Sequence, residues 1–311
     1  MIIVTGGAGF IGSNIVKGLN KKGYKNIVIV DDLTDGHKFI NLTDLEFVDY
    51  CDKDDFLKQI QNNTLGYKID SIFHEGACSA TTEWNGKFIM EVNYEYTKKL
   101  FHYAIDHKIP FIYASSAAVY GTKSDNFVED NSFEKPVNVY GYSKYLFDKY
   151  VETYKATYGL NSPVCGFRYF NVYGYGEFHK GSMASVAYHL HLQIQSGNII
   201  KLFEGSEGFF RDFVYIDDVV DVNIWALENG LSGVFNLGTG SSASFLKVGE
   251  LVLDHYKRGE LHYIDFPEHL KGHYQAYTQA DMSKLREAVY QKEFTSIEDG
   301  IRQYIINLDN K

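Results

Sequence analysis

Residues 5–12 read Thr5-Gly6-Gly7-Ala8-Gly9-Phe10-Ile11-Gly12, and this stretch decides the fold of the chain. Its glycines give the spacing G-x-G-x-x-G between the apolar run Ile2–Thr5 and a helical pattern over 11–21. Glycine lets a backbone turn tightly after a strand and approach a pyrophosphate, whose charge then lies at a helix N-terminus. The acidic residue Asp31 follows about twenty residues later, as in dinucleotide-binding units. The stretch therefore predicts a dinucleotide site.

Short apolar runs alternate with helical patterns through the first half of the chain. The runs expected to be buried parallel strands, because they are apolar on both faces, are Ile2–Thr5, Asn26–Asp31, Ser71–His74, Pro110–Ser115 and Pro163–Arg168. The helical patterns between them are Ile11–Lys21, Lys53–Gln61, Met90–Asp106 and Ser143–Tyr158. This alternation predicts an α/β fold with a doubly wound, Rossmann-type parallel sheet.

The rhythm loosens after about Phe170, which predicts a second, smaller lobe. Its expected elements are the helices Ser182–Gln195, Ile216–Glu228 and Ser296–Leu308 and the strands Ile200–Phe203, Val234–Leu237 and Leu261–Phe266. We expect a dinucleotide-binding domain over 1–170 and a substrate-binding lobe over 171–311, with elements interleaved between them. No low-complexity tract or linker separates the two.

The composition excludes several classes of function. The chain has 311 residues, is 45% hydrophobic and carries 30 Lys+Arg against 40 Asp+Glu, a formal net charge of −10. An acidic surface disfavours nucleic acid and anionic membranes. No signal peptide or membrane-spanning run is evident, so a cytoplasmic location is expected, in which Cys51, Cys78 and Cys165 would be buried, reduced thiols. The eleven histidines form no H-E-x-x-H motif, and no metal site is expected.

Two acidic residues and two lysines bear on the choice of dinucleotide. Asp31 and Asp32 would favour NAD, because a carboxylate binds the adenosine ribose 2′-hydroxyl and repels a 2′-phosphate. Lys38 and Lys53 could offset that repulsion, although each is also typical of solvated surface. The residues alone leave NAD and NADP both open.

A tyrosine, a lysine and a serine form the candidate catalytic group. Tyr140 and Lys144 give the spacing Tyr-x-x-x-Lys, which places both side chains on one face of a helix. Tyrosine normally titrates near pH 10, and we expect the lysine cation to stabilise the phenolate and lower that pKa. Upstream, Ser116 lies at the expected end of a strand, where its hydroxyl could hold a substrate alcohol.

These blocks resemble the extended short-chain dehydrogenase/reductase family over nearly the full chain. The matching stretches are TGGAGFIG (5–12), HEGA (74–77), Asn93, SSAAVYG (115–121), YGYSK (140–144), FRYFNVYG (167–174), RDFVYIDD (211–218) and FNLGTG (235–240). The resemblance implies a Rossmann domain with a smaller lobe for a nucleotide sugar. Dehydratases of the family carry an acidic pair where this chain has Ala117 and Ala118, so epimerisation or simple redox chemistry is expected.

Longer stretches resemble one bacterial subfamily, the ADP-heptose 6-epimerases of lipopolysaccharide inner-core synthesis. They are VDDLTDGHKF (30–39), EGACSATTEWNGK (75–87), HKGSMASVAYHL (179–190), LFEGSEGFFRDFVY (202–215) and LKGHYQAYTQAD (270–281). Asp32 and His273 depart from the subfamily pattern, which has Asn and Arg there. The resemblance implies hydride removal from C6 and its return to the opposite face, with Tyr140 and Lys180 as the two acid–base groups. Lys180 could instead bind phosphate or order a loop.

The resemblance also implies two sets of ligand contacts, NADP as the preferred cofactor and a homopentamer. The residues expected to line the dinucleotide are Gly6, Gly9, Phe10, Ile11, Gly12, Asp31, Asp32, Lys38, Lys53, Glu75, Gly76, Ala77, Cys78, Ser79, Asn93, Lys144, Val172 and Lys180. Those expected to hold the ADP-heptose are Ser116, Asn171, Ser182, His189, Phe203, Glu204, Gly205, Ser206, Arg211 and Tyr274. A UDP-hexose 4-epimerase of the same fold and a non-catalytic dinucleotide-binding module remain alternatives.

Overall fold

The computed structural model describes residues 1–122, 126–267 and 275–310. The chain divides into two compact units, and each is assembled from three separate stretches of sequence. The first unit contains Met1–Val119, Pro136–Arg168 and Val219–Phe235, and the second contains Tyr120–Lys135, Tyr169–Asp218 and Asn236–Lys311. Which ligand each unit holds stays a prediction.

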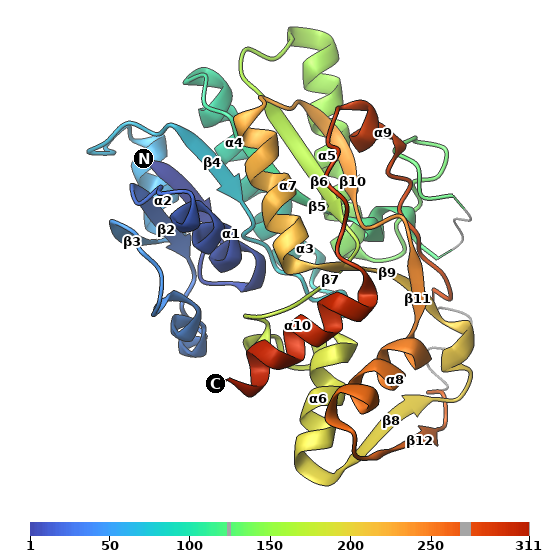
Figure 1. Cartoon of the computed structure of the whole chain (residues 1–311). Helices are drawn as coiled ribbons and strands as arrows, with labels where there is room; N and C mark the ends of the chain where they lie inside the picture. Colours follow the sequence, from blue (N-terminus) through green and yellow to red (C-terminus); the bar gives the residue numbers. More distant parts are fainter. Residues whose placement is uncertain (123–125, 268–274, 311) are drawn as a thin grey trace. The chain divides into compact units, whose positions relative to one another are not determined.

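A seven-stranded sheet forms the centre of the first unit (Figure 1). Its strands are β1 (Ile2–Thr5), β2 (Ile27–Asp31), β3 (Asp49–Asp52), β4 (Ser71–His74), β5 (Phe111–Ser116), β6 (Val164–Tyr169) and β10 (Gly233–Leu237). They lie in the order β10-β6-β5-β4-β1-β2-β3, and the pairings of β1 with β2 and β4, of β2 with β3 and of β4 with β5 are parallel. This order contains the 3-2-1-4-5-6 arrangement of a Rossmann fold, so the predicted fold class is confirmed.

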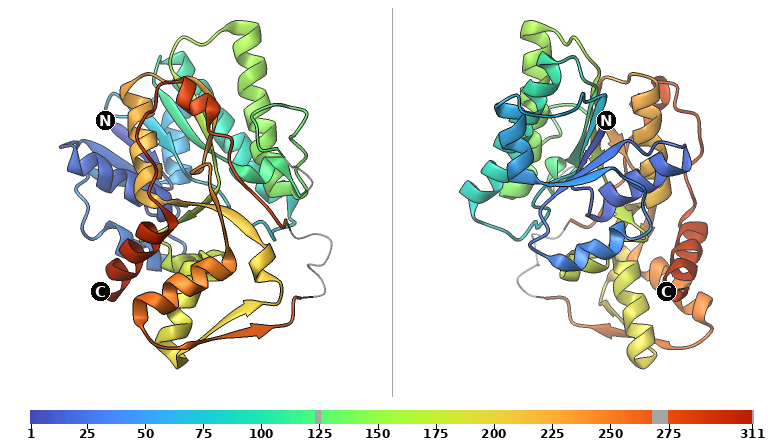
Figure 2. Two further views of the ribbon diagram at one scale, coloured as in Figure 1. Left: turned by 45° about the vertical axis from the view of Figure 1, so that its right-hand side comes forward. Right: turned by 90° about the vertical axis from the view of Figure 1, so that its left-hand side faces the viewer.

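Helices cover both faces of this sheet (Figures 1 and 2). On one face, α2 (Lys53–Gln61), α4 (Tyr96–Asp106) and α5 (Val139–Tyr158) pack their apolar side chains against β1, β2, β4 and β5 to form the main core. On the other lie α1 (Phe10–Lys21) and α7 (Ile216–Glu228). A Cβ at Gly18 of α1 would lie 2.3 Å from a methyl group of Val220, so glycine is what allows these two helices their close approach.

The second unit combines two small sheets with helices. Its strands are β7 (Asn171–Tyr173), β8 (Ile199–Phe203), β9 (Phe210–Tyr215), β11 (Ser242–Ser244) and β12 (Glu260–Ile264), paired in the orders β11-β9-β7 and β12-β8. Helix α8 (Phe245–Tyr256) packs against both α6 (Val186–Gly197) and α10 (Ile297–Asp309). The shorter helices are α9 (Ser283–Glu287) here and α3 (Gly86–Ile89) in the first unit.

Several sequence-based expectations about these elements were wrong. The strands β3, β7, β9 and β11 were not predicted, because β3 and β11 lack an apolar run and the buried charges of β9 interrupt its run. Residues Phe178–Met183 form a 3-10 helix, so α6 begins at Val186 and not at Ser182. Cys51 and Cys78 are only partly buried, whereas Cys165 is fully buried as expected, and none of the three forms a disulfide.

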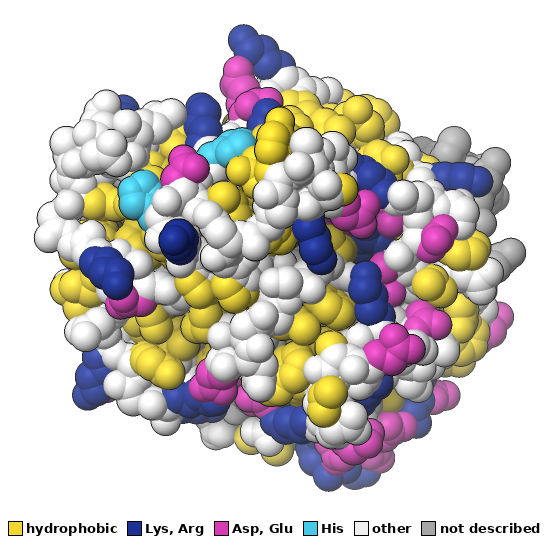
Figure 3. All heavy atoms as spheres, turned by 90° about the horizontal axis from the view of Figure 1, so that it is seen from above, with side chains coloured by type: hydrophobic (Ala, Val, Ile, Leu, Met, Phe, Trp, Pro, Cys, Tyr) yellow, Lys and Arg dark blue, Asp and Glu magenta, His cyan; other side chains and the backbone are white. Residues whose placement is uncertain are grey.

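The surface carries charges of both signs. Lysine and arginine side chains are interspersed with aspartate and glutamate on the face shown in Figure 3. No helix in the described ranges has the length and apolarity to cross a membrane.

Candidate active site

The glycine-rich turn between β1 and α1 is tightly packed and leads directly into the start of a helix. Gly6 adopts a left-handed conformation, with φ +64°, and its carbonyl oxygen accepts a hydrogen bond from the Gly9 amide at 2.9 Å. A Cβ at Gly12 would lie only 2.2 Å from that oxygen, so no larger residue fits there without moving the turn. The first turn of α1 carries no acidic side chain, which leaves its amide groups suited to an anion. These features fit a dinucleotide pyrophosphate.

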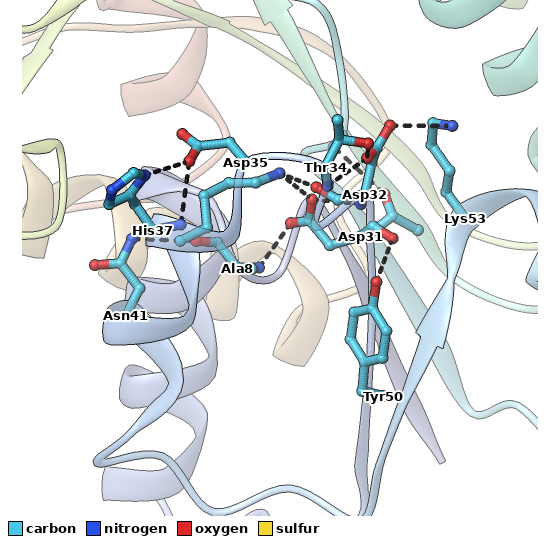
Figure 4. A network of polar contacts seen from close by, with 12 residues as sticks. Ala8, Asp31, Asp32, Thr34, Asp35, His37, Asn41, Tyr50 and Lys53 are labelled. Carbon is cyan, nitrogen blue, oxygen red and sulfur yellow. Dashed lines mark hydrogen bonds and ion pairs between the residues drawn. The ribbon is translucent and has the colours of Figure 1, made fainter. Parts of the chain in front are cut away.

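Asp31, at the end of β2, braces this turn (Figure 4). Its carboxylate accepts hydrogen bonds from the amides of Ala8 at 2.8 Å and Asp32 at 2.7 Å, and it pairs with the Lys38 ammonium at 2.6 Å. The Asp31 side chain is buried, and the Tyr50 hydroxyl donates to its carbonyl oxygen at 3.1 Å. Asp31 therefore holds the glycine turn and Lys38 in place.

Asp32 is the more exposed member of the acidic pair. Hydrogen bonds from the Thr34 hydroxyl and amide lower the pKa of its carboxyl to about 2. The Lys53 ammonium lies 3.3 Å from Oδ2 of Asp32 (Figure 4). It also lies 3.0 Å from a carboxylate oxygen of Asp54. The structure thus brings Lys38 and Lys53 to the acidic pair, where their charges could offset its repulsion of a 2′-phosphate.

Asn93 connects the segment after β4 to α5. It lies in a π-helical turn, Met90–Glu95, a feature that is frequent at functional sites. Its side-chain amide accepts from the Cys78 amide at 2.8 Å and donates to the Cys78 carbonyl at 3.0 Å and to the Ser143 hydroxyl at 3.2 Å. Ser143 in turn donates to the Tyr140 carbonyl at 2.7 Å. Asn93 therefore positions both the predicted cofactor segment 75–79 and the start of α5.

Tyr140 and Ser116, two of the predicted catalytic residues, are joined by a side-chain hydrogen bond that was not predicted from the sequence. Ser116 ends β5, and Tyr140 lies in the first turn of α5, where Asn138 caps the helix by accepting from the Gly141 amide at 2.7 Å. Burial raises the pKa of Tyr140 above its ordinary value, while the hydrogen bond from Ser116 partly opposes that rise. The prediction that Lys144 lowers the pKa of Tyr140 was therefore wrong. Desolvation of the buried hydroxyl outweighs the other effects and raises this pKa.

Lys144 lies one turn further along α5 and is almost fully buried. Its ammonium donates to the Ala114 carbonyl at 2.7 Å. Burial lowers its pKa to about 8, against the opposing effect of Glu75 and Asp148. Lysine has three donor hydrogens, so the contact with Ala114 leaves capacity for ligand hydroxyls.

Apart from Ser116, the described residues predicted to hold substrate lie in the second unit, together with two predicted cofactor contacts. Asn171 and Val172 belong to β7, Lys180 and Ser182 to the 3-10 helix, His189 to α6, Phe203 to β8 and Glu204, Gly205 and Ser206 to the turn after it. Burial lowers the pKa of Lys180, as an acid–base role requires, and Glu177 opposes that shift. Tyr274 and His273 lie outside the described residues.

Arg211 and Ser206 show two features suited to a polar ligand. The Arg211 guanidinium donates to the Phe210 carbonyl at 2.8 Å and stacks 5.5 Å from the centre of the Phe245 ring. Ser206 is buried, yet its hydroxyl has no hydrogen-bond partner among the described residues. An arginine guanidinium has five N–H donors in a planar arrangement that suits oxyanions.

Three buried carboxylates support the site and were not predicted from the sequence. Asp148 of α5 accepts from Tyr113, Ser115 and Arg168, at 3.0, 2.8 and 3.0 Å. Glu177 precedes Lys180, and Asp212 follows Arg211 and accepts from the amides of Thr239, Gly240 and Ala280 at 2.7–3.0 Å. Their spacing was an available signal, because each lies within four residues of a predicted site residue.

His74 is a further supporting residue that the sequence did not single out by itself. It is buried at the end of β4, with its ring nitrogens 2.6 Å from the Thr5 hydroxyl and 2.8 Å from the Thr97 hydroxyl. Burial and the Lys144 charge lower its pKa to about 3. His74 is therefore a neutral link between β1, β4 and α4.

Comparison with known proteins identifies a family. The sequence model described as the NAD dependent epimerase/dehydratase family matches residues 2–238. The structure of ADP-L-glycero-D-manno-heptose-6-epimerase from Helicobacter pylori is 32% identical, with a TM-score of 0.87, over 100% of this chain and 96% of that one. UDP-glucose 4-epimerase from Thermotoga maritima, solved with UDP-glucose, is 27% identical, with a TM-score of 0.83, over 99% of this chain and 98% of that one.

A third structure shares the fold. UDP-N-acetylglucosamine 4-epimerase from Methanobrevibacter ruminantium, solved with UDP-N-acetylmuramic acid, has a TM-score of 0.86 over 99% of this chain and 98% of that one. Its identity is 24%, so it speaks for the architecture alone.

Proposed function

The chain belongs to the NAD-dependent epimerase/dehydratase family, and from that premise we propose that it inverts C6 of an ADP-linked heptose. The reaction would convert ADP-D-glycero-β-D-manno-heptose to its L-glycero epimer through a C6-keto sugar. The observation that carries this proposal is the 32% identity with the H. pylori heptose epimerase over the whole chain. We further propose that the protein is a cytoplasmic homopentamer that supplies heptose for the lipopolysaccharide inner core.

Epimerisation is favoured over dehydration by the residues that follow Ser116. Elimination of water needs an additional acid and base beside the serine and tyrosine. The short 3-10 helix Ala117–Tyr120 carries Ala117 and Ala118 there, and neither side chain can move a proton. The tyrosine–serine pair that remains suits reversible oxidation of an alcohol.

Oxidised nicotinamide, when bound, supplies a hydride acceptor that returns the same hydride, so no external reductant is consumed. Tyr140 takes the proton of the C6 hydroxyl. The hydroxyl of Ser116 holds that C6 hydroxyl in place by a hydrogen bond. Lys144 would bind the ribose hydroxyls of the dinucleotide. Because the hydride returns to the opposite face of C6, a second group must give the proton back there, and we assign that role to Lys180.

We propose NADP as the preferred dinucleotide. Lys38 and Lys53 lie 2.6 and 3.3 Å from carboxylate oxygens of Asp31 and Asp32, so two cations are present where a 2′-phosphate would meet the acidic pair. The carboxylate of Asp31 is already occupied by the glycine turn, which weakens the argument that it serves a ribose hydroxyl of NAD. NAD remains the alternative because Asp32 keeps an exposed carboxylate oxygen beside Lys53.

The proposed contacts to the ADP-heptose are Ser116 and a set of residues from the second unit. Arg211 suits the diphosphate, because its planar guanidinium can bind oxyanions in bidentate fashion. The hydroxyl of Ser206, which no described residue satisfies, suits a ligand oxygen. The remaining proposed contacts are Asn171, Ser182, His189, Phe203, Glu204, Gly205 and Tyr274.

The test is incubation of the purified protein, loaded with NADP or with NAD, with ADP-D-glycero-D-manno-heptose in deuterated water. We expect C6 inversion by NMR, no deuterium at C6 and no net reduction of the cofactor. Tyr140→Phe should retain the dinucleotide and lose conversion by at least about a hundredfold. Deuterium at C6 would refute hydride transfer and favour deprotonation.

Two other results would replace the proposal. The T. maritima likeness, at 27% identity over 99% of the chain, favours a UDP-hexose 4-epimerase as the second candidate. Conversion of UDP-galactose without conversion of the ADP-heptose would establish that candidate. Dinucleotide binding without turnover of any nucleotide sugar would instead indicate a binding module.

A further inference from the structure

Glu177 carries a fully buried carboxylate in the second unit, immediately before the 3-10 helix that contains Lys180. One oxygen accepts from the Ser185 hydroxyl at 2.6 Å, the Tyr304 hydroxyl at 2.9 Å and, weakly, the Gly174 amide at 3.4 Å. The other oxygen accepts from the Ser185 amide at 2.5 Å. A buried charge of this kind is tolerated only when its oxygens are satisfied, so these donors form one connected unit with Glu177.

The four hydrogen bonds close the loop that carries Lys180. Gly174 lies just before the loop and Ser185 just after it, so one carboxylate joins both ends of the segment 174–185. Tyr304 lies on α10, which ties the closed loop to the helical part of the second unit (Figure 1). The loop therefore depends on Glu177 for its anchorage.

Inside the loop, the backbone forms a defined turn around Lys180. The Lys180 amide donates to the Glu177 carbonyl at 2.9 Å, which forms the turn. Gly181 follows with φ +53° and ψ −127°, a conformation that side-chain-bearing residues rarely adopt, and no atom lies within 4 Å of where its Cβ would be. Glycine is thus needed here for its backbone, and the turn directs the chain sharply away after Lys180.

We propose that Glu177 is the positioning residue for the Lys180 ammonium, holding the loop so that Lys180 serves one of the two opposite-face proton transfers. The proposal rests on the proposed function, because it requires Lys180 to be the second acid–base group. It adds a residue that touches neither substrate nor cofactor and acts through the loop. Its removal should impair the Lys180-dependent step and spare the Tyr140-dependent step.

Each C6 epimer allows one of these steps to be observed alone. In the two-base scheme, oxidation of one epimer uses Tyr140 and oxidation of the other uses Lys180. Holoenzyme loaded with the oxidised cofactor is therefore mixed with each ADP-heptose epimer separately. The near-ultraviolet absorbance of reduced nicotinamide then reports each oxidation in a single turnover.

The expected result is an asymmetry between the two epimers. Lys180→Met should slow oxidation of one epimer by about a hundredfold or more and leave the other near wild type. Glu177→Gln should slow the same epimer by at least about tenfold, because the carboxamide nitrogen cannot accept from Ser185 and the loop loosens. Tyr304→Phe, which removes one of the four donors, should give a smaller effect of the same kind.

Tyr173→Phe is the matched control for Tyr304→Phe. Its ring lies 6.3 Å from that of Tyr304 and is equally buried, but its hydroxyl has no hydrogen-bond partner among the described residues. This variant should oxidise both epimers at the wild-type rate. The comparison separates loss of the Glu177 contact from loss of a buried hydroxyl.

Two outcomes would overturn the inference, and they are distinguishable. If Lys180→Met shows the asymmetry and Glu177→Gln slows both epimers equally, Glu177 is only a structural residue and the two-base function stands. If Lys180→Met slows neither epimer selectively, the two-base function fails and the inference fails with it. Should Glu177→Gln not fold, Tyr304→Phe decides: an asymmetry absent from Tyr173→Phe supports the inference, and equal rates for both epimers overturn it.

Discussion

Replacing Asp148 by Asn should cost the first unit about 3–5 kcal/mol of unfolding free energy. Asp148 has no exposed surface, and its partner Arg168, 3.0 Å away, is 1% exposed. Removing one charge of such a pair leaves the other buried without compensation, which is the case that costs several kcal/mol. The carboxamide also turns a donor toward Tyr113 or Ser115, both of which need an acceptor.

The control is Glu152→Gln, one turn further along the same helix. Its pair with Lys149 lies at 3.0 Å and is partly exposed, with side-chain exposures of 21% and 49%. Pairs of this kind contribute about 0–1 kcal/mol, so the variant should unfold like wild type. Both variants change one carboxylate to a carboxamide on α5, which isolates the effect of burial.

Urea unfolding, followed by circular dichroism and by tyrosine fluorescence, measures the difference. Coincident transitions establish a single unfolding step, and unchanged slopes allow the midpoints to be converted to free energies. If Asp148→Asn lies within about 1 kcal/mol of Glu152→Gln, the buried pair does not hold β5, β6 and α5 together as argued.

Two other substitutions test the site. Gly12→Ala should abolish tight dinucleotide binding in a folded protein, because the new Cβ would lie 2.2 Å from the Gly6 carbonyl oxygen. The assay is a calorimetric titration with the dinucleotide. The control is Gly66→Ala, whose new Cβ would have no atom within 4 Å and which should bind normally. The pKa of Lys144 is about 8 when folded, below its ordinary 10.5, so the unfolded chain binds more protons between these values and stability rises with pH across that window. Lys144→Met should remove a rise of about 3 kcal/mol, and parallel pH slopes for the two proteins would contradict the assignment.

The central sheet was predictable because its strands are apolar on both faces. The runs at Ile2–Thr5 and Ser71–His74 became strands with those bounds, and the helices at Lys53–Gln61 and Ile216–Glu228 likewise. The edge strand Asp49–Asp52 could not be predicted in this way, because an edge strand needs no apolar run. The second unit was harder to predict because β7 and β11 are only three residues long, β12 is largely exposed and the buried strand β9 contains charged residues.

Motif spacing predicted candidate residues for the chemistry, and the structure adds the contacts that hold these side chains in place. The predicted residues Tyr140 and Ser116 share a hydrogen bond, and Lys38 and Lys53 reach Asp31 and Asp32 at the end of β2. The pKa of Tyr140 was predicted in the wrong direction, because a spacing rule records the neighbouring cation and not the loss of solvent. Burial is a property of the whole fold, and no local pattern encodes it.

The buried carboxylates show why an overall charge says little about an acidic protein. Asp148, Glu177 and Asp212 all contribute to the net charge of −10, yet none has exposed surface to present to a partner. Each accepts hydrogen bonds from segments that are far apart in the sequence. Asp148 joins β5 and β6 to α5, and Glu177 joins α10 to the 174–185 loop. Asp212 joins the amides of residues 239, 240 and 280 to β9. Neutral variants of these residues would change the net charge by one unit, as would any surface Glu→Gln change. A buried carboxylate has no water to hydrogen-bond and must take its donors from the protein itself. Substitutions of the buried carboxylates should therefore disturb the segments that carry Lys144, Lys180 and Arg211, whereas surface substitutions should not.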